Sequence, residues 1–229
     1  MQKNTYFKLD EQFFIQFNRA QAYKKGEMIL RAQEEPKEVY FLKKGFVRLY
    51  LIALTGREIT FNIYKPGTYF PMIWAIGNLP NFYFFESLTD TVVYRAPREK
   101  LLELVKNNPK LLFALTKRTY IGLDGIVRLT QALLTENARG KLISVLLVLG
   151  RRFGRKETNG DLVIRLPLTH RILASLANLS RETTSLALEK LQKEKVLTFN
   201  KHSITINKLQ KIEEESSIVA IEKATNLTF

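Results

Sequence analysis

The chain has 229 residues, of which 45% are hydrophobic, so it is long enough for one large or two modest domains with real cores. It has no cysteine, which excludes disulfides, thiolate metal sites, iron–sulfur clusters and cysteine nucleophiles. The longest apolar runs, such as 142–150, are too short to span a bilayer, and residues 1–19 lack the apolar core of a signal peptide. We therefore expect a cytoplasmic protein that makes no membrane contact.

The net charge of +14 is concentrated in the second half of the chain. Residues 109–207 contain 17 Lys and Arg against 7 Asp and Glu, whereas residues 1–108 contain 16 against 11. A module that binds a polyanion requires such a local cationic excess. A proteome that is rich in lysine is the alternative explanation of the charge.

Residues 20–100 are predicted to form short antiparallel strands separated by turns. Four segments alternate in hydropathy, and the last three of the glycines between them are each 11 residues apart. The expected strands are 39–42, 47–51, 58–63 and 91–94, and the glycines are Gly26, Gly45, Gly56 and Gly67. This spacing favours an antiparallel β-roll or jelly roll over residues 1–108, with a short amphipathic helix after Pro97.

Aromatic residues are concentrated in the same region, with nine of them within residues 61–85. We favour the interpretation that they fill the interior of the barrel; a pocket for a small apolar effector of unknown identity is the alternative. The candidate pocket residues are Tyr69, Phe70, Met72, Trp74, Phe85 and Glu86. Both histidines, His170 and His202, lie outside the barrel, so we expect no haem ligand, metal site or other cofactor there.

A long helix is predicted over residues 109–136. Apolar and small residues recur after Leu112 at alternating steps of three and four, as in a coiled-coil seam. Such a helix usually packs on its own copy as a two-fold dimer, and burial against the barrel is the alternative. Gly122 and Gly125 weaken the helix by about 1 kcal/mol each relative to alanine, and they permit either close helix contact or a bend. The predicted seam is Leu115, Thr119, Gly122, Ile126, Leu129 and Leu133.

Residues 137–207 are expected to form a second, smaller domain. A basic amphipathic helix and a strand lead into two short helices joined by a tight turn, and two further strands predict a β-hairpin. The segments are a helix over 138–153, a strand over 162–166, the helix pair within 168–195 and strands over 196–199 and 203–206. This order of parts is typical of a winged helix-turn-helix. Residues 208–229 are expected to be a polar tail.

The helix pair has the local signals of a helix-turn-helix. Thr169 can cap the first helix, and Ser180 can cap the second. Asn178 lies in the turn, where a left-handed backbone is often required and asparagine tolerates it. One face of the second helix is expected to be buried, and it consists of Thr184, Ala187, Leu188 and Leu191. We expect this second helix to enter the major groove of double-stranded DNA.

The opposite face of the second helix is predicted to read bases. Arginine can bond guanine in a bidentate manner, glutamate can accept from cytosine, and an exposed leucine can contact a thymine methyl group. The predicted base-reading residues are Arg181, Glu182, Ser185 and Leu186. Residues at helix starts and in the hairpin are predicted to contact phosphates, namely Thr169, Arg171, Ser180, Thr183, Lys201 and His202. A solvated surface is the alternative for both sets.

A β-roll, a long helix and a winged helix together resemble the CRP/FNR superfamily of bacterial transcription regulators. The most specific segments are EVYFLKKGFVRLY (38–50), Thr55-Gly56, Pro66-Gly67, ARGKLISVLLVLGRRFG (138–154) and LSRETTS (179–185). The resemblance implies an α+β fold with an N-terminal antiparallel β-roll like a cyclic-nucleotide-binding domain, a long dimerisation helix and a C-terminal winged helix-turn-helix. It also implies a homodimer that binds a palindrome near promoters and acts on RNA polymerase.

Two departures from the family pattern concern the ligand and the target. Family members that bind cyclic nucleotides hold the ribose and phosphate with a Phe-Gly-Glu turn and an Arg-Ser pair, which here read Phe70-Pro71-Met72 and Phe85-Glu86-Ser87. Pro71 lacks a backbone donor, Met72 cannot accept from a ribose hydroxyl, and Glu86 repels phosphate. We therefore expect no cyclic nucleotide binding. Leu186 occupies a position where the family commonly has an arginine, so the base that the protein prefers at one step of the target is not predicted.

An enzyme and a non-specific binder are the other classes to consider. The chain has no histidine before position 170, no Walker lysine motif, no nucleophile elbow and no GxGxxG, so we expect no enzymatic activity. A basic architectural or RNA-binding protein without sequence preference is the remaining alternative to a specific regulator.

Overall fold

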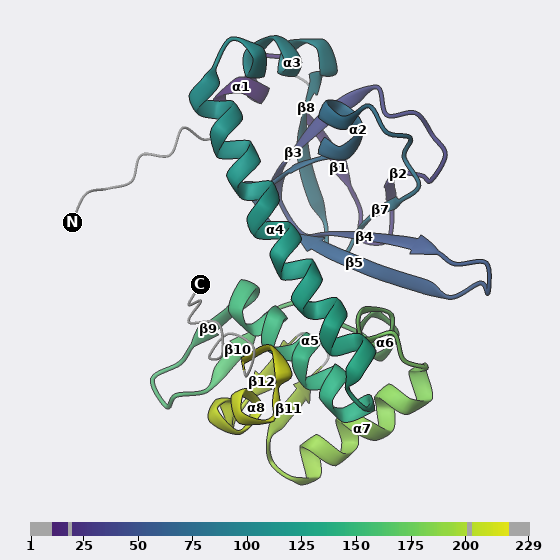
Figure 1. The fold of residues 1–229 in the computed structure, drawn as a ribbon, viewed down its shortest axis with the longest axis vertical. Coiled ribbons are helices and arrows are strands. Elements are labelled where there is room, and N and C mark those ends of the chain that lie inside the picture. The colour runs from purple at the N-terminus through teal and green to yellow at the C-terminus, as the bar shows by residue number, and fades with distance from the viewer. Residues whose placement is uncertain (1–10, 18–19, 201–202, 220–229) are drawn as a thin grey trace. The chain divides into compact units, whose positions relative to one another are not determined.

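Eight antiparallel strands follow one another over residues 20–97 of the computed structural model, which describes residues 11–17, 20–200 and 203–219 (Figure 1). They form two four-stranded sheets with the orders β1-β8-β3-β6 and β2-β7-β4-β5. The strands are β1 (Ala20–Tyr23), β2 (Met28–Leu30), β3 (Glu38–Lys44), β4 (Val47–Ile52), β5 (Glu58–Tyr64), β6 (Tyr69–Phe70), β7 (Phe84–Ser87) and β8 (Thr91–Pro97). The predicted β-roll is confirmed.

The four strands predicted from alternation correspond to β3, β4, β5 and β8, each of which is longer than predicted. The other four strands, which the sequence did not indicate, have only two to four residues, too few for an alternating pattern to stand out. The sequence pattern also did not indicate α2 (Met72–Gly77), a helix of only six residues between β6 and β7. The strand ends are therefore set by pairing with neighbours and not by local pattern.

The strand β3 contributes side chains to two separate cores. Tyr40 and Leu42 point into the space between the two sheets, where they pack with residues of β2, β4, β6, β7 and β8. Val39 and Phe41 point to the other face, which helices cover. Because successive side chains of a strand alternate between faces, a strand buried on both faces is continuously hydrophobic. This accounts for the run VYFL in the sequence.

Helices cover the outer face of the β1-β8-β3-β6 sheet. The helices α1 (Glu11–Ile15), α2, α3 (Arg98–Lys106) and the first turns of α4 (Pro109–Thr135) supply Phe14, Trp74, Leu101, Val105, Leu111 and Leu115 to one core. Gly45 joins β3 to β4 with a φ of 89°, and a Cβ there would lie 2.6 Å from the carbonyl oxygen of Asp90. Only glycine fits this turn without displacing backbone.

The chain divides into two units, residues 1–122 and 123–229, and α4 is continuous through the division. The second unit contains α5 (Ala138–Phe153), β9 (Gly154–Lys156), β10 (Leu162–Ile164), α6 (His170–Ala177), α7 (Arg181–Lys193), β11 (Leu197–Asn200), β12 (Ser203–Ile206) and α8 (Leu209–Glu215). Its sheet has the order β11-β12-β10-β9. The predicted winged helix-turn-helix is confirmed, with β9 as an additional strand.

The polar tail predicted from residue 208 is corrected for residues 209–219. Residues 209–215 form α8, and Ile212, Ile218 and Val219 are buried. The three glutamates at 213–215 suggested a solvated segment, but α8 packs against α5, and of these glutamates Glu215 bonds Arg139 of α5. None of the helices in the part of the chain that the structure describes is long and apolar enough to cross a membrane.

Candidate nucleic-acid interface

The helix pair α6 and α7 begins and turns at the residues that the sequence indicated. The Thr169 hydroxyl accepts a hydrogen bond from the backbone N–H of Ile172 at 3.2 Å. The Ser180 hydroxyl accepts from the backbone N–H of Thr183 at 3.0 Å. Asn178 ends α6 with a φ of 50° in the left-handed region. Each cap satisfies a backbone donor that a helix start otherwise leaves unpaired, so the turn is defined locally.

The inner face of α7 anchors it to the rest of the unit. Thr184, Leu188 and Leu191 are fully buried, and the Thr184 hydroxyl donates to the Ser180 carbonyl at 2.8 Å. On the other face, Arg181 and Glu182 are exposed, and Leu186 is 68% exposed. Hydrogen bonds from its own backbone N–H and from the Ser180 hydroxyl hold the pKa of Glu182 below its ordinary value. The carboxylate is therefore an acceptor at neutral pH.

Ser185, the fourth predicted base reader, has an intramolecular partner. Its hydroxyl lies 2.8 Å from Nδ1 of His170, the first residue of α6, and the pair is partly buried. A hydroxyl held in this way has less freedom to bond a base. The sequence could not indicate the contact, because the two residues are 15 positions apart and share no motif.

Three of the predicted phosphate contacts, Thr169, Ser180 and Thr183, also take part in helix caps. The one hydrogen of the Ser180 hydroxyl is within reach of the Thr183 hydroxyl at 3.0 Å and of the Glu182 carboxylate, so it is already used within the first turn of α7. The Thr183 hydroxyl keeps its own hydrogen for an outside acceptor. Arg171 is exposed in the first turn of α6. Lys201 and His202 lie outside the described residues.

The wing strand β11 is attached to both helices. The ring of Phe199 meets the His170 ring edge-on, with centroids 4.9 Å apart. The backbone N–H of Phe199 donates to the side-chain oxygen of Gln192 on α7 at 3.1 Å. His170 therefore contacts α7 through Ser185 and the wing through Phe199. Neither His170 nor Gln192 was predicted as a site residue for this role.

Ion pairs fix the C-terminal end of α7. Arg139 of α5 bonds both carboxylate oxygens of Glu194, the C-cap residue of α7, at 2.8 Å each. Arg139 also bonds Glu215 of α8 at 2.8 Å, and Lys211 bonds Glu194 at 3.1 Å. The Arg139 and Lys211 bonds lower the pKa of Glu194 to about 2. Such bidentate pairs impose direction as well as attraction, so α5 and α8 orient α7.

The interior of the β-roll is filled by its own aromatic rings, as we favoured. Phe70 and Phe85 are fully buried and stack with centroids 5.0 Å apart, and Phe70 also stacks on Tyr40 and Tyr64. The cavity that remains beside Met72 has a volume of about 30 Å³. Small-molecule sites are usually about 300–1,000 Å³. This space holds about one water molecule.

The packing of its residues therefore does not support the alternative of an effector pocket inside the roll. Phe70 and Phe85 are core residues, and Tyr69 belongs to the other core, on the helix side of the sheet. Glu86 pairs with Arg48 at 3.4 Å, beside the Arg48–Glu58 pair at 2.7 Å. Of these candidate pocket residues, only Trp74 borders a larger hollow, which adjoins the 30 Å³ cavity at Trp74, Pro80 and Asn81.

The exposed apolar face of α4 is displaced from the predicted seam. Leu115 is 7% exposed because it packs in the N-terminal core, and Leu129 and Leu133 are half-buried. Four exposed apolar residues recur at steps of seven: Phe113, Tyr120, Val127 and Leu134. Leu112, Ile121, Leu123 and Ile126 are further exposed apolar residues of α4. Only Ile126 is common to this face and to the predicted seam. We call Phe113, Tyr120, Leu123, Val127 and Leu134 the exposed stripe.

Comparison with known proteins matches both units. Residues 20–108 match the family model for a cyclic nucleotide-binding domain, and residues 140–215 match that for a Crp-like helix-turn-helix domain. The global nitrogen regulator of a Nostoc species is 27% identical over 194 residues, which cover 82% of this chain and 85% of that protein. The HTH-type transcriptional regulator ArcR of Staphylococcus haemolyticus is 27% identical over 178 residues, or 78% of each chain.

Solved structures agree in fold. FixK2 from Bradyrhizobium japonicum superposes with a TM-score of 0.74 at 23% identity, over 86% of this chain and 96% of that one. A CRP/FNR-family transcriptional regulator from Thermus thermophilus superposes with a TM-score of 0.68 at 24% identity, over 86% of this chain and 97% of that one. At these identities the likeness concerns the fold alone.

A β-roll of the cyclic-nucleotide-binding type followed by a Crp-like helix-turn-helix defines a DNA-binding transcription regulator. The class is consistent with the exposed, capped start of α7 and with relatives that are regulators and not enzymes. The chain belongs to the CRP/FNR family of such regulators.

Proposed function

We propose that the protein acts as a homodimer on a two-fold symmetric DNA site near promoters, without cyclic nucleotide. The observation that carries the proposal is the first turn of α7, where Arg181 and Glu182 are exposed beside a capped backbone. Recognition helices use their N-terminal residues to contact base edges in the major groove. Arg181 bonds guanine, Glu182 accepts from cytosine, and Leu186 packs on a thymine methyl group.

Phosphate contacts surround the base-reading turn in this proposal. Arg171, Thr169 and Thr183 bond phosphates near the helix starts, and Lys201 and His202 do so from the wing. Ser180 positions Thr183 through their hydrogen bond. The excess of 17 basic over 7 acidic residues in 109–207 supports this arrangement, because each phosphate neutralised releases counterions.

Dimerisation is proposed to use the exposed stripe of α4. Side chains such as Phe113 and Leu134 are 72% and 79% exposed in a single chain, which is unusual for a row of large apolar residues. A repeat of seven residues is typical of a helix that packs on another helix. Two linked recognition helices then bind half-sites about one helical turn apart.

Cyclic nucleotides are not expected to bind the roll. The 30 Å³ cavity is too small for one, and Pro71, Met72 and Glu86 replace the groups that hold its phosphate and ribose. We predict no heat of binding when cyclic AMP or cyclic GMP is titrated into the protein by calorimetry. Saturable binding in the micromolar range would contradict this part of the proposal.

RNA polymerase as a partner and a cytoplasmic location complete the proposal. Both are typical of the family, and bacterial promoters are transcribed in the cytoplasm. The test of the whole proposal is unbiased selection of bound DNA from a random pool. We expect a two-fold symmetric motif; recovery of the unselected pool would contradict sequence-specific recognition.

Non-specific nucleic-acid binding is the second candidate, and the cationic excess of residues 109–207 favours it. Competition separates the two functions. Labelled DNA with the selected site is displaced from a specific regulator only by unlabelled DNA of the same sequence. From a non-specific binder it is displaced equally by unrelated DNA and by RNA. The salt dependence of binding is steep in both cases and does not discriminate.

A further inference from the structure

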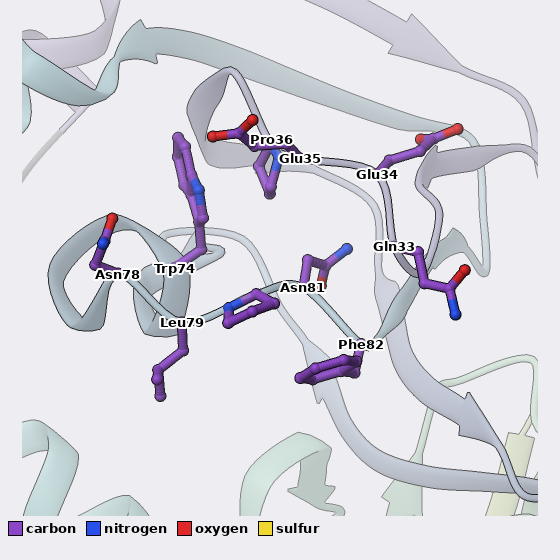
Figure 2. A pocket seen from close by; sticks show the side chains of 10 residues that line it. Gln33, Glu34, Glu35, Pro36, Trp74, Asn78, Leu79, Asn81 and Phe82 are labelled. Carbon is purple, nitrogen blue, oxygen red and sulfur yellow. The ribbon is translucent and has the colours of Figure 1, made fainter.

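A hollow on the outside of the β-roll lies between two loops of the first unit. One loop follows β2, and the other follows α2, and the hollow shares Trp74, Pro80 and Asn81 with the small cavity beside Met72. Its volume is about 420 Å³, within the usual range of roughly 300–1,000 Å³ for small-molecule sites. Figure 2 shows its lining, which consists of Gln33, Glu34, Glu35, Pro36, Trp74, Asn78, Leu79, Pro80, Asn81 and Phe82.

Hydrogen bonds between the two loops hold the hollow in shape. The backbone N–H of Gln33 donates to the Asn81 carbonyl at 2.8 Å. The Asn81 side chain donates to the carbonyls of Arg31 at 2.8 Å and Tyr83 at 3.0 Å, and it is 6% exposed. A buried side-chain amide that donates hydrogen bonds to backbone carbonyls of both loops fixes the distance between the loops. The hollow is therefore formed before any ligand arrives.

The apolar part of the lining is exposed to solvent. Leu79 is 56% exposed and Phe82 is 60% exposed, whereas Trp74 is 8% exposed and points toward the loop that contains Glu35 and Pro36 (Figure 2). Large apolar side chains grouped around a concave surface mark sites that bind something. An apolar body of a ligand would replace the water that these side chains now contact.

The charged part of the lining is acidic, in a chain whose net charge is +14. Glu34 is engaged, since its carboxylate accepts from the Arg31 backbone N–H at 3.1 Å and pairs with the Arg31 side chain at 3.9 Å. Glu35 has no hydrogen-bond or ion-pair partner among the described residues. None of the lining residues is cationic. The hollow thus offers one unpaired carboxylate beside an apolar surface.

We propose that this hollow binds a small organic cation with an aromatic or aliphatic body. The cationic group pairs with Glu35, and the body packs on Trp74, Leu79 and Phe82. The guanidinium of Arg98, which is not part of the lining, lies 5.1 Å from the centre of the Trp74 ring.

Arg98 also links the hollow to the helix that leads into α4. It donates to the Ala75 carbonyl at 3.0 Å and to the Asn78 side-chain oxygen at 2.8 Å, and it is the first residue of α3. A ligand that shifts Trp74 or Asn78 therefore acts on the start of α3. An effect of the ligand on DNA binding rests on the function proposed above, whereas binding of the ligand does not.

The test uses Trp74, the only tryptophan of the chain, as a fluorescent reporter. Three probes of similar size differ in charge: phenethylammonium, 2-phenylethanol and 3-phenylpropionate. We expect saturable fluorescence changes with the cation binding about threefold to tenfold more tightly than the anion, as one exposed ion pair allows. Failure of all three probes to bind, by fluorescence and by calorimetry, overturns the proposal, and so does equal affinity for cation and anion.

Variants separate the two parts of the site. Glu35→Gln should abolish the preference for the cation and leave 2-phenylethanol binding unchanged, and Phe82→Ser should weaken all three probes. Glu34→Gln is the matched control, because that carboxylate is bonded to Arg31. If Glu34→Gln removes the preference and Glu35→Gln does not, the site is wrong. Affinity for the selected DNA is measured in parallel. If the protein does not bind this DNA, the proposed function is overturned, but the fluorescence result for the hollow still stands.

Discussion

Arg181 and Arg171 lie in the first turns of two neighbouring helices, yet we assign them different tasks. Arg181 follows the Ser180 cap at the start of α7, the position from which a recognition helix reaches base edges. Arg171 lies in the first turn of α6, which in a helix-turn-helix runs across the DNA backbone. The same side chain therefore provides sequence discrimination in one place and general affinity in the other.

Alanine substitutions should separate these tasks. Arg181→Ala is expected to cost about 1–3 kcal/mol on the preferred site and to relax the choice at one guanine. Arg171→Ala should weaken binding to all sequences alike and reduce the salt slope by about one. Affinities over single-base operator variants at several salt concentrations provide the measurement. A uniform loss across variants for Arg181→Ala would mean that Arg181 bonds only phosphate.

Glu194 predicts a dependence of stability on acid. Its pKa is about 2 in the folded chain against an ordinary value of 4.5, because it is bonded by Arg139 and Lys211. A lowered folded-state pKa contributes stability above the unfolded value, and this contribution is lost as the pH falls from about 4.5 towards about 2. Glu194→Gln should lower the urea midpoint at neutral pH and flatten its decline in that range.

The control for Glu194 is Glu189→Gln on the same helix. Among the described residues, Glu189 pairs with Lys193 alone, at 3.9 Å, and both side chains are mostly exposed. Its removal should leave both the midpoint and its pH dependence nearly unchanged, since such exposed pairs contribute little. If the two variants behave alike, the Arg139 and Lys211 pairs do not support α7.

At the scale of elements, His170 connects α6, α7 and the wing. Its bond to Ser185 predicts that Ser185→Ala acts on stability and not on base preference. We expect Ser185→Ala and His170→Ala each to lower the free energy of unfolding by about 1 kcal/mol or more. The double variant should be less destabilised than the sum, because both remove the same bond. Additive losses, or a changed base preference with unchanged stability for Ser185→Ala, would restore Ser185 as a base reader.

The elements most accurately predicted from the sequence are those with their own end signals. Thr169, Asn178 and Ser180 define α6 and α7 through contacts within four residues, so no tertiary information was needed. The predicted bounds of α5, and of β12 in the wing, are also those observed. Local chemistry is sufficient wherever a cap or a turn residue marks the boundary.

Other features depended on contacts between distant segments and could not be predicted. The role of Ser185 depends on a partner 15 residues away, and the outer hollow depends on loops about 45 residues apart. The predicted seam of α4 and the exposed stripe differ because two neighbouring rows of the helix are both apolar. Leu115 of the predicted row is buried in the N-terminal core, and Leu129 and Leu133 are half-buried, which local pattern alone does not reveal.

At the scale of the whole molecule, one helix belongs to both units. The helix α4 begins in the core of the β-roll and continues into the second unit, and the exposed stripe extends from residue 113 to residue 134. A partner helix along this stripe would therefore contact residues of both units. Dimerisation, DNA binding and any signal from the β-roll would then depend on the same element.

Charged residues in the exposed stripe should separate the chains. Val127→Glu with Tyr120→Glu is expected to give monomers in sedimentation and to lose affinity for the full symmetric site, because two recognition helices must be linked to bind both half-sites. Neither residue belongs to the seam predicted from the sequence, so the variant also tests whether the dimer uses the exposed stripe instead of that seam.

Leu54→Glu, at a fully exposed apolar residue of the β4–β5 turn, is the matched control and should remain dimeric. Circular dichroism shows whether the variant is folded. A folded monomer that binds the full site as the parent protein does would refute the proposed dimer, and a variant that stays dimeric would return the seam to the row containing Leu129.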